Sequence, residues 1–145
     1  ANINKKEPQS VVLLQPTYPY RKKNDLKIAL KKHIKQNRNP IVAVQRMQEH
    51  PCECFYKGRN DSINYLIPPP QNNNRQNYPE DFFFITGNFY ISSIHKLKSE
   101  KSFINSKTEF FETSEKLIID IDTPKDFEFA EKVYSWMKEC DLTNL

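Results

Sequence analysis

The sequence predicts an α/β protein with a mostly parallel sheet flanked by helices. Two short apolar runs rich in β-branched residues, 10–15 and 41–46, are typical of strands that are covered on both faces. Between these runs, apolar residues recur at helical spacing, with lysines on the other side: Leu26, Ala29, Leu30, His33 and Ile34. A strand, a helix and a strand in sequence predict a βαβ unit, in which the two strands run parallel.

The rest of the chain predicts further strands and two more helices. Asn24 is a candidate N-cap for the first helix, which ends at 37–40. Strand character returns in four segments, at 82–85, 89–91, 108–112 and 117–121, and 93–99 predicts a short helix. The last helix begins at Thr123 as N-cap, with Pro124 at its first position and Asp126 at its third, and it extends to Cys140.

Length and composition indicate one domain, residues 1–145, in a reducing compartment. The 145 residues are 37% hydrophobic and 28% charged, and no stretch approaches the roughly 20 apolar residues that cross a membrane. Three cysteines argue against a disulfide scaffold, and the start of the chain lacks the apolar segment of a secretory signal. We therefore expect a cytoplasmic protein without a membrane partner. The net charge of +4 is spread over dispersed lysines, which does not favour nucleic-acid binding.

The glycine count restricts the phosphate-binding chemistry. Only Gly58 and Gly87 occur in the chain. A Gly-rich phosphate loop needs several residues that can take a positive φ or let phosphate approach the backbone. The sequence therefore excludes such a loop within these 145 residues.

The segment Ile119-Asp120-Ile121-Asp122 contains the strongest chemical signal. Side chains of a strand alternate between faces, so both carboxylates are predicted on one face and both isoleucines on the other. Carboxylates so close repel unless a cation shares them, and Mg²⁺ takes a few protein oxygens and completes its shell with water and phosphate. The alternative is that Asp122 supports the helix start while Asp120 faces solvent.

The turn after the first strand is a second candidate site. Gln15 and Thr17 stand in a segment that is stiffened by Pro16 and Pro19. Such a turn places hydrogen-bonding groups at the carboxyl edge of the sheet, where ligands bind in open α/β folds. The alternative is a Pro-rich turn without a binding role.

Other potential metal ligands and nucleophiles have less support. A zinc site needs about four ligands at suitable spacing, but Cys52 and Cys54 near His50 are one residue apart and no second pair follows. His33 lies on the apolar face of a helix and is predicted to be packed in the core. Cys140 has no base nearby in the sequence and is predicted to be inert.

Four motifs, in order, resemble the N-acylneuraminate cytidylyltransferases (CMP-sialic acid synthetases). Residues 14–21 (LQPTYPYR) resemble the family's LQPTSPLR turn, and residues 75–79 (RQNYP) are similar to its RQ-x-x-P segment. Residues 86–91 (TGNFYI) are similar to its NGAIYI strand, and residues 119–131 resemble its SIDIDT-x-x-D-x-x-x-AE ending. The resemblance covers most of the chain, from about Val11 to Lys138.

The resemblance implies a Rossmann-like nucleotidyltransferase domain and a specific reaction. The family transfers CMP from CTP to an acidic nine-carbon sugar, giving a CMP-sugar and pyrophosphate. It also implies a homodimer, in which residues 50–85 form a dimerisation excursion of short strands and loops. In this chain that excursion would contain the triple proline 68–70 and the polar run 71–74.

The resemblance also implies roles for individual residues. Asp120 and Asp122 would be catalytic and would hold Mg²⁺ against the triphosphate. Gln15 would hydrogen-bond the sugar, and Arg75 would stand near its carboxylate. Further substrate contacts are implied for Thr17, Gln76, Thr86, Gly87, Tyr90 and Phe103.

The chain also departs from the family pattern. The family begins with a strand and a loop of the kind ARGGSKGIPRKN that binds CTP, and this sequence has no counterpart. We therefore expect a C-terminal portion that is inactive by itself. Glu53 stands where a nearby lysine is common, and Thr86 replaces an asparagine, so the choice among nonulosonic acids stays open. The alternatives are a non-catalytic remnant that binds sugar or dimerises, and a cytidylyltransferase for another acidic sugar such as Kdo.

Overall fold

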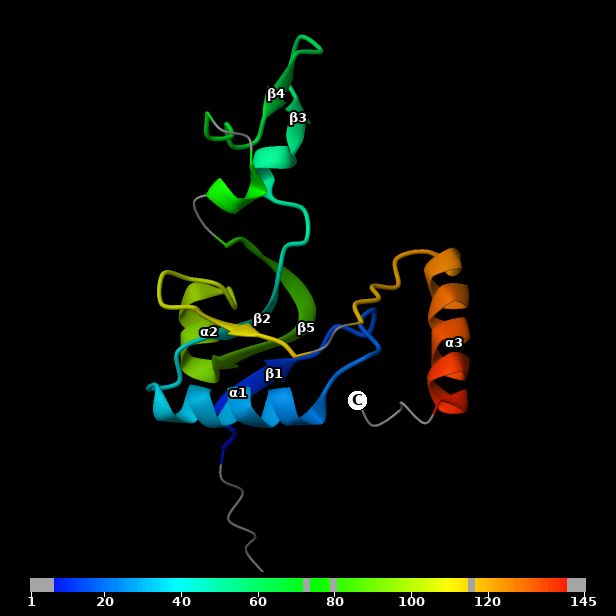
Figure 1. Ribbon diagram of the computed structural model, residues 1–145. Helices are drawn as coiled ribbons and strands as arrows, with labels where there is room; N and C mark the ends of the chain where they lie inside the picture. The colour runs from blue at the N-terminus through cyan, green and yellow to red at the C-terminus, as the bar shows by residue number, and fades with distance from the viewer. Residues whose placement is uncertain (1–6, 72–73, 79–80, 115–116, 141–145) are drawn as a thin grey trace, which may run out of the picture. The chain divides into compact units, whose positions relative to one another are not determined.

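The computed structural model describes residues 7–71, 74–78, 81–114 and 117–140. The chain divides into two compact units (Figure 1). The larger unit comprises Ala1–Val44 and Ile85–Leu145, and the smaller unit comprises Gln45–Phe84. The smaller unit has bounds close to those of the predicted excursion. Each unit is described by itself below.

A four-stranded mixed sheet forms the centre of the fold. Its strands are β1 (Ser10–Leu13), β2 (Ile41–Arg46), β5 (Phe83–Ser93) and β6 (Glu109–Glu112), in the order β1-β5-β2-β6. β1 and β5 are antiparallel, with Val12 opposite Ile91, and β2 and β6 are parallel, with Val42 opposite Phe110. The fold is therefore α/β, as predicted, but the sheet is mostly antiparallel with one parallel pair.

The prediction of a mostly parallel sheet is wrong because of β5. The chain leaves β2 at Arg46 and returns at Phe83, where the Met47 N–H donates a 2.8 Å hydrogen bond to the Phe82 carbonyl. A chain that turns back beside the strand it has just left runs antiparallel to that strand. The two short strands predicted at 82–85 and 89–91 are one strand of 11 residues, which passes through Gly87.

The strand predicted at 117–121 is absent, because residues 117–122 have no regular secondary structure. This segment has one backbone hydrogen bond to the turn after β1, from the Ile121 N–H to the Thr17 carbonyl at 2.8 Å. A strand needs a ladder of such bonds to a neighbour. Residues 115–116 lie outside the described part of the chain.

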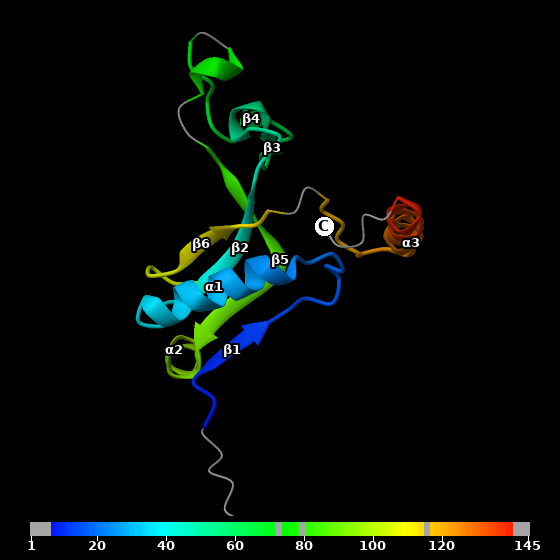
Figure 2. The same cartoon turned by 60° about the horizontal axis from the view of Figure 1, so that its bottom comes forward.

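One face of helix α1 (Lys23–Lys35) packs on the sheet (Figure 2). The core cluster contains Ala29 from the helix and four strand residues, namely Ile41, Ala43, Phe89 and Ile91. His33 is buried, as predicted, and its ring nitrogens contact Ser10 Oγ at 2.9 Å and the Asn39 carbonyl at 2.7 Å. These apolar contacts and paired polar groups hold β1, α1 and β2 together.

Helix α1 begins two residues earlier than the predicted Asn24 cap would allow. Its N-cap is Lys22, and Asn24 lies inside the first turn. The buried Asp25 accepts hydrogen bonds from the Ser114 N–H and hydroxyl at 2.6 and 3.0 Å, which ties the first turn to the segment after β6. A tertiary contact therefore sets the helix start in place of a local Asn cap.

Helix α3 begins at the predicted residue, and helix α2 begins one residue after the predicted start at Ser93. Helix α2 (Ile94–Glu100) is capped by Ser93, whose hydroxyl accepts the Lys96 N–H at 3.1 Å. Helix α3 (Pro124–Glu139) has Thr123 as N-cap and Pro124 at its first position. Its Ala130 is buried, but Phe127, Phe129, Tyr134 and Trp136 are about half exposed. No helix in the described part of the chain has the length and apolar character to cross a membrane.

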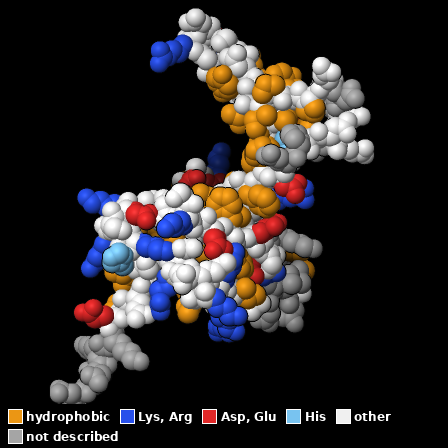
Figure 3. Space-filling model, turned by 90° about the vertical axis from the view of Figure 1, so that its left-hand side faces the viewer, with side chains coloured by type: hydrophobic (Ala, Val, Ile, Leu, Met, Phe, Trp, Pro, Cys, Tyr) orange, Lys and Arg blue, Asp and Glu red, His pale blue; other side chains and the backbone are white. Residues whose placement is uncertain are grey.

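The smaller unit consists of a hairpin and two single-turn helices. Strands β3 (Phe55–Lys57) and β4 (Ile63–Tyr65) pair antiparallel, and the short helices are η1 (Pro51–Glu53) and η2 (Arg75–Asn77). The Phe55 and Tyr65 rings lie 4.4 Å apart. Large apolar side chains remain exposed on and beside the hairpin: Phe55, Tyr56, Ile63, Tyr65 and Leu66. Hydrophobic side chains accordingly gather on this unit (Figure 3).

Candidate functional site

The turn after β1 lies directly against β5. The Gln15 N–H donates a hydrogen bond to the Gly87 carbonyl at 3.4 Å. Gly87 has φ +71°, and a Cβ added there would lie 1.9 Å from Gln15 Oε1. Only glycine fits this conformation and this close approach without displacing the Gln15 side chain.

The same turn also contacts the acidic segment. The Thr17 carbonyl accepts the Ile121 N–H, and Ile121 stands between Asp120 and Asp122. Ile119 is buried and Ile121 is half-buried, whereas both aspartates are exposed. The predicted alternation of apolar and acidic side chains is therefore present in an extended segment without a ladder, and both carboxylates are accessible to solvent.

Tyr90, on β5, lies near the acidic segment. Its ring centroid lies 5.8 Å from that of Phe103. Burial raises the pKa of the Tyr90 phenol, and the nearby negative charge of Asp120 raises it further. The phenol therefore stays protonated at neutral pH, so it can donate a hydrogen bond and does not serve as a base.

Thr86 and Asn88 flank Gly87 on β5, and Asn88 shares a face of the strand with Tyr90, because residues two apart in a regular strand point to the same side. The buried Thr86 hydroxyl donates to the Ala43 carbonyl at 3.4 Å and accepts the Asn88 N–H at 3.3 Å. The Thr86 side chain thus has partners within the sheet. The buried Asn88 Nδ2 has no hydrogen-bond partner among the described residues, which marks a place for water or a ligand atom.

Arg21 is a positioning residue that the sequence analysis did not select. Its Nε donates to the Asn88 carbonyl at 2.8 Å, and its Nη2 donates to the Gln15 carbonyl. One side chain therefore joins the turn to β5 at the point where Gln15 lies over Gly87. Arg21 is the last residue of the LQPTYPYR motif. Its place in that motif is the sequence feature that could have identified it.

The carboxylate of Asp126, and not that of Asp122, completes the capping box in which Thr123 is the N-cap of the last helix. The Asp126 carboxylate accepts the Thr123 N–H at 2.7 Å and the Asp122 N–H at 3.2 Å, and the Thr123 hydroxyl accepts the Asp126 N–H at 3.3 Å. These bonds form a capping box. The Thr123 hydroxyl also donates to the Asp126 carboxylate at 2.8 Å, and this bond, together with the backbone N–H bonds, lowers the pKa of Asp126. Asp122 contributes its backbone to this cap, so its carboxylate is available for another role.

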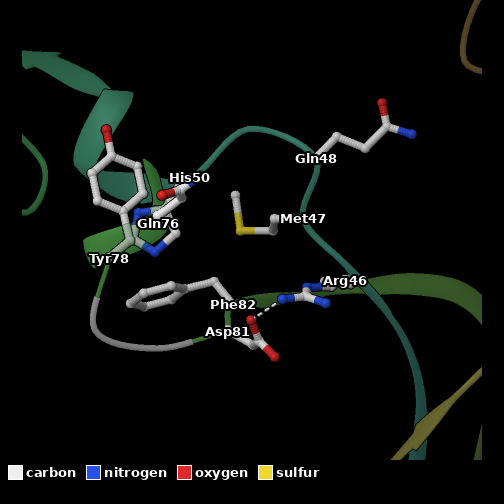
Figure 4. Close-up of a pocket in the computed structure, with 8 residues that line it drawn as sticks. All are labelled: Arg46, Met47, Gln48, His50, Gln76, Tyr78, Asp81 and Phe82. Carbon is white, nitrogen blue, oxygen red and sulfur yellow. Dashed lines mark hydrogen bonds and ion pairs between the residues drawn. The ribbon is translucent and has the colours of Figure 1, made fainter. Parts of the chain in front are cut away.

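Gln76 and Arg75 belong to the smaller unit, whereas the other predicted site residues belong to the larger one. Gln76 lines a cavity of about 400 Å³ with His50, Tyr78, Phe82 and the Arg46–Asp81 ion pair (Figure 4). The His50 ring lies 4.3 Å from the Tyr78 ring and 4.9 Å from the Phe82 ring. Arg75 begins η2, and its side chain lies outside the described part of the structure.

The side chains of the acidic segment and of the smaller unit limit which metal ions the chain could bind. Among the described residues, no group of three or more His, Cys, Asp or Glu side chains could hold a metal ion. His50 Nδ1 accepts the Cys52 N–H at 3.1 Å, and Cys52 Sγ lies 4.0 Å from the Pro68 carbonyl. Two exposed carboxylates, Asp120 and Asp122, fit a Mg²⁺ ion that takes its other oxygens from water and phosphate.

Sequence comparison makes this chain a distant homologue of nucleotidyltransferases that make CMP-sugars. It is 30% identical over 134 residues to the CMP-N,N'-diacetyllegionaminic acid synthase of Legionella pneumophila, covering 90% of this chain and 56% of that protein. It is 25% identical over 119 residues to the N-acylneuraminate cytidylyltransferase of Streptococcus agalactiae serotype V, covering 82% of this chain and 29% of that protein. No family model matches the chain.

These relatives confirm the resemblance that the four motifs predict, at low identity. The chain spans about half the length of the Legionella relative and under a third of the streptococcal one.

Proposed function

We propose that this chain forms the sugar-binding and metal-binding part of a cytidylyltransferase. The enzyme would transfer CMP from CTP to an N-acylneuraminate or a related nonulosonic acid. The observation that carries this proposal is the 30% identity to a CMP-N,N'-diacetyllegionaminic acid synthase over 90% of the chain. It is supported by the placement of Gln15, Gly87 and the acidic segment around one turn.

In the proposed reaction, the anomeric hydroxyl oxygen of the sugar forms a bond to the α-phosphorus of CTP. The bond between that phosphorus and the bridging oxygen breaks, pyrophosphate leaves, and the hydroxyl proton passes to solvent. Gln15 would hydrogen-bond the sugar from a position set by Gly87 and Arg21. Tyr90 would donate its phenolic proton in a hydrogen bond, because its raised pKa keeps it neutral. Thr17 would hold the acidic segment in place through its carbonyl.

Asp120 and Asp122 would hold Mg²⁺, which supplies positive charge against the triphosphate and the leaving pyrophosphate. Their exposure lets phosphate and water oxygens complete the metal shell. Asp120 also raises the Tyr90 pKa, so its negative charge already acts on the sugar side of the site. The two halves of the proposed site, metal and sugar, therefore meet at Asp120.

We further propose that the enzyme works as a homodimer through the smaller unit. The hairpin exposes Phe55, Tyr56, Ile63, Tyr65 and Leu66. Exposed apolar groups of this size mark interaction surfaces in soluble proteins. Arg75, Gln76 and the cavity beside Gln76 would then contribute to sugar binding as part of the dimer.

The test uses a chimera together with the chain itself. The matching segment of the Legionella relative is replaced by this chain, and pyrophosphate release is measured with CTP, Mg²⁺ and a panel of nonulosonic acids and Kdo. Sugar-dependent release from the chimera supports the proposal, and the sugar that reacts fastest identifies the substrate. A folded chimera that is inactive with every sugar would favour the non-catalytic remnant.

The 145-residue chain alone is the companion sample. It lacks a Gly-rich loop to position the triphosphate, and positioning supplies much of the catalysis in such transfers. We expect no turnover of CTP from it. Robust pyrophosphate release from the chain alone would overturn the assignment of CTP positioning to the rest of the enzyme.

A further inference from the structure

A basic cavity lies at the end of the sheet opposite Gln15. It has a volume of about 530 Å³ and is lined by residues from the segment before β1, the turn after α1, the end of β5, and α2. Its charged members are Arg38, Lys96 and Lys98. Among the residues that the structure describes, no Asp or Glu lines it. Figure 3 shows Lys and Arg side chains on this face of the larger unit, with Asp and Glu side chains also present on it.

Arg38 is held in place by a fixed turn. Asn37 and Arg38 both have left-handed backbones, with φ of 51° and 55°. The Arg38 N–H donates to the His33 carbonyl at 2.9 Å, and its Nη2 donates to Gln9 Oε1 at 2.5 Å. The guanidinium is therefore presented from an ordered position at the cavity.

Arg38 and Lys96 form no ion pair within the part of the chain that the structure describes. Lys96 Nζ donates to Asn39 Oδ1 at 2.6 Å, and Arg38 bonds the Gln9 side chain, so both partners are neutral amides. The ion pairs found among the described residues involve other cations: Lys32, Arg46 and Lys57. Among the described residues that line the cavity, three are cations and none is an acid.

His33 lies next to this cavity, and the pKa of its ring depends on the positive charge there. The ring is buried between Ser10 and Asn39, which are the neighbours of Gln9 and Arg38 in the chain. Burial lowers the pKa of His33 most strongly, the hydrogen bond to the Asn39 carbonyl raises it, and the charges of Arg38 and Lys96 lower it further. The positive field of the cavity therefore reaches a buried group that can be observed separately.

We propose that this basic cavity binds a small phosphate-type anion with two or more negative charges. A guanidinium and two ammonium groups match phosphate oxygens in charge and hydrogen-bonding geometry. Gln9 and Gln15 are six residues apart along β1 and its flanks, which separates the two sites by roughly 20 Å in an extended chain. The cavity is thus distinct from the proposed CTP site, and this inference does not depend on the proposed function.

The experiment titrates the chain with inorganic phosphate, pyrophosphate and CMP, and follows amide and histidine-ring NMR signals. We expect saturable shifts at Gln9, Arg38 and Lys96. We also expect a rise in the His33 pKa, because the bound anion offsets the cations that lower it. Response to inorganic phosphate indicates a free-anion site, whereas response to CMP alone assigns it to nucleotide phosphates.

The variants Lys96→Gln and Arg38→Gln test the residues. Each should weaken pyrophosphate binding by about tenfold, and the double variant should abolish saturation. Lys27→Gln, on an exposed position of α1 away from the cavity, should bind within about twofold of the parent. The proposal is overturned if shifts occur only around Gln15 and Gly87, if the His33 pKa does not rise, or if the double variant binds like the parent.

Discussion

The Gln15 side chain lies over Gly87 so closely that a Cβ at position 87 would stand 1.9 Å from Gln15 Oε1. This contact joins the turn after β1 to the middle of β5. Arg21 holds the same two elements together by donating to the carbonyls of Gln15 and Asn88. The position of Gln15 therefore depends on a glycine and an arginine from separate parts of the chain.

Replacing Gly87 by alanine should displace Gln15 and weaken sugar use. The new Cβ would meet Gln15 Oε1, and φ of +71° costs a non-glycine residue about 1–2 kcal/mol. In the chimera, we expect a higher KM for the sugar and a modest loss of unfolding free energy. Gln15→Ala in the Gly87→Ala background should cause little further loss of sugar affinity. Additive losses from the two changes would contradict the dependence of one residue on the other.

Variants of Asp122 and Asp126 should have different effects, because the first residue is proposed to bind metal and the second stabilises the start of α3. Asp122→Asn in the chimera should lower turnover by about 10²-fold or more and weaken its Mg²⁺ dependence, because a metal ligand is lost. Its melting temperature should hold or rise, because repulsion from Asp120 is relieved.

Asp126→Asn is the matched variant for that experiment. It removes the carboxylate that accepts the Thr123 and Asp122 N–H groups, so the melting temperature should fall. Because the folded chain lowers the Asp126 pKa, this stabilisation is present above the ordinary pKa of 3.8 and is lost as pH falls below it. An Asp122→Asn enzyme with normal turnover would exclude the metal role.

The exposed hairpin should control association. Ile63 is 75% exposed on β4, and Ile63→Lys should shift the chain toward monomer in sedimentation experiments, because it places a charge in the proposed apolar interface. Ile34, which is 60% exposed on α1, provides the matched control. Ile34→Lys should leave association unchanged. Equal effects of both changes would indicate general stickiness in place of a specific dimer.

His33 should make stability depend on pH. The folded chain lowers the pKa of this buried ring, mainly through burial, so the unfolded chain binds its proton more tightly. The stability that the neutral His33 ring contributes is therefore fully present above the ordinary pKa of 6.5. It is lost as the pH falls through the lowered pKa of the folded chain. Urea unfolding between about pH 7.5 and 5 measures this loss.

His33→Gln tests the assignment. It should lower the unfolding free energy by about 1–3 kcal/mol at pH 7.5, because the contacts to Ser10 and Asn39 are disturbed, and it should reduce the pH dependence. The exposed His95→Gln should retain the pH dependence of the parent. A slope that is unchanged in His33→Gln would assign the effect to other groups.

Short-range sequence patterns were sufficient for several elements. The last helix could be predicted because Thr123, Pro124 and Asp126 act within one turn. The outward position of Asp120 and Asp122 could be predicted because alternation is a property of any extended backbone. The order of the motifs was sufficient to identify the relatives, since it needs no knowledge of which residues touch.

By itself, the sequence determined the α/β class, the last helix, the acidic alternation and the relationship to CMP-sugar synthases. Only the tertiary structure decided the direction of β5, the absence of a ladder at residues 117–122, the start of α1 at Lys23, and the role of Arg21. The physical reason is that these features depend on partners distant in the chain: Asp25 bonds Ser114, Ile121 bonds Thr17, and Arg21 bonds Asn88. Composition and periodicity describe the preferences of one segment and do not specify its partner.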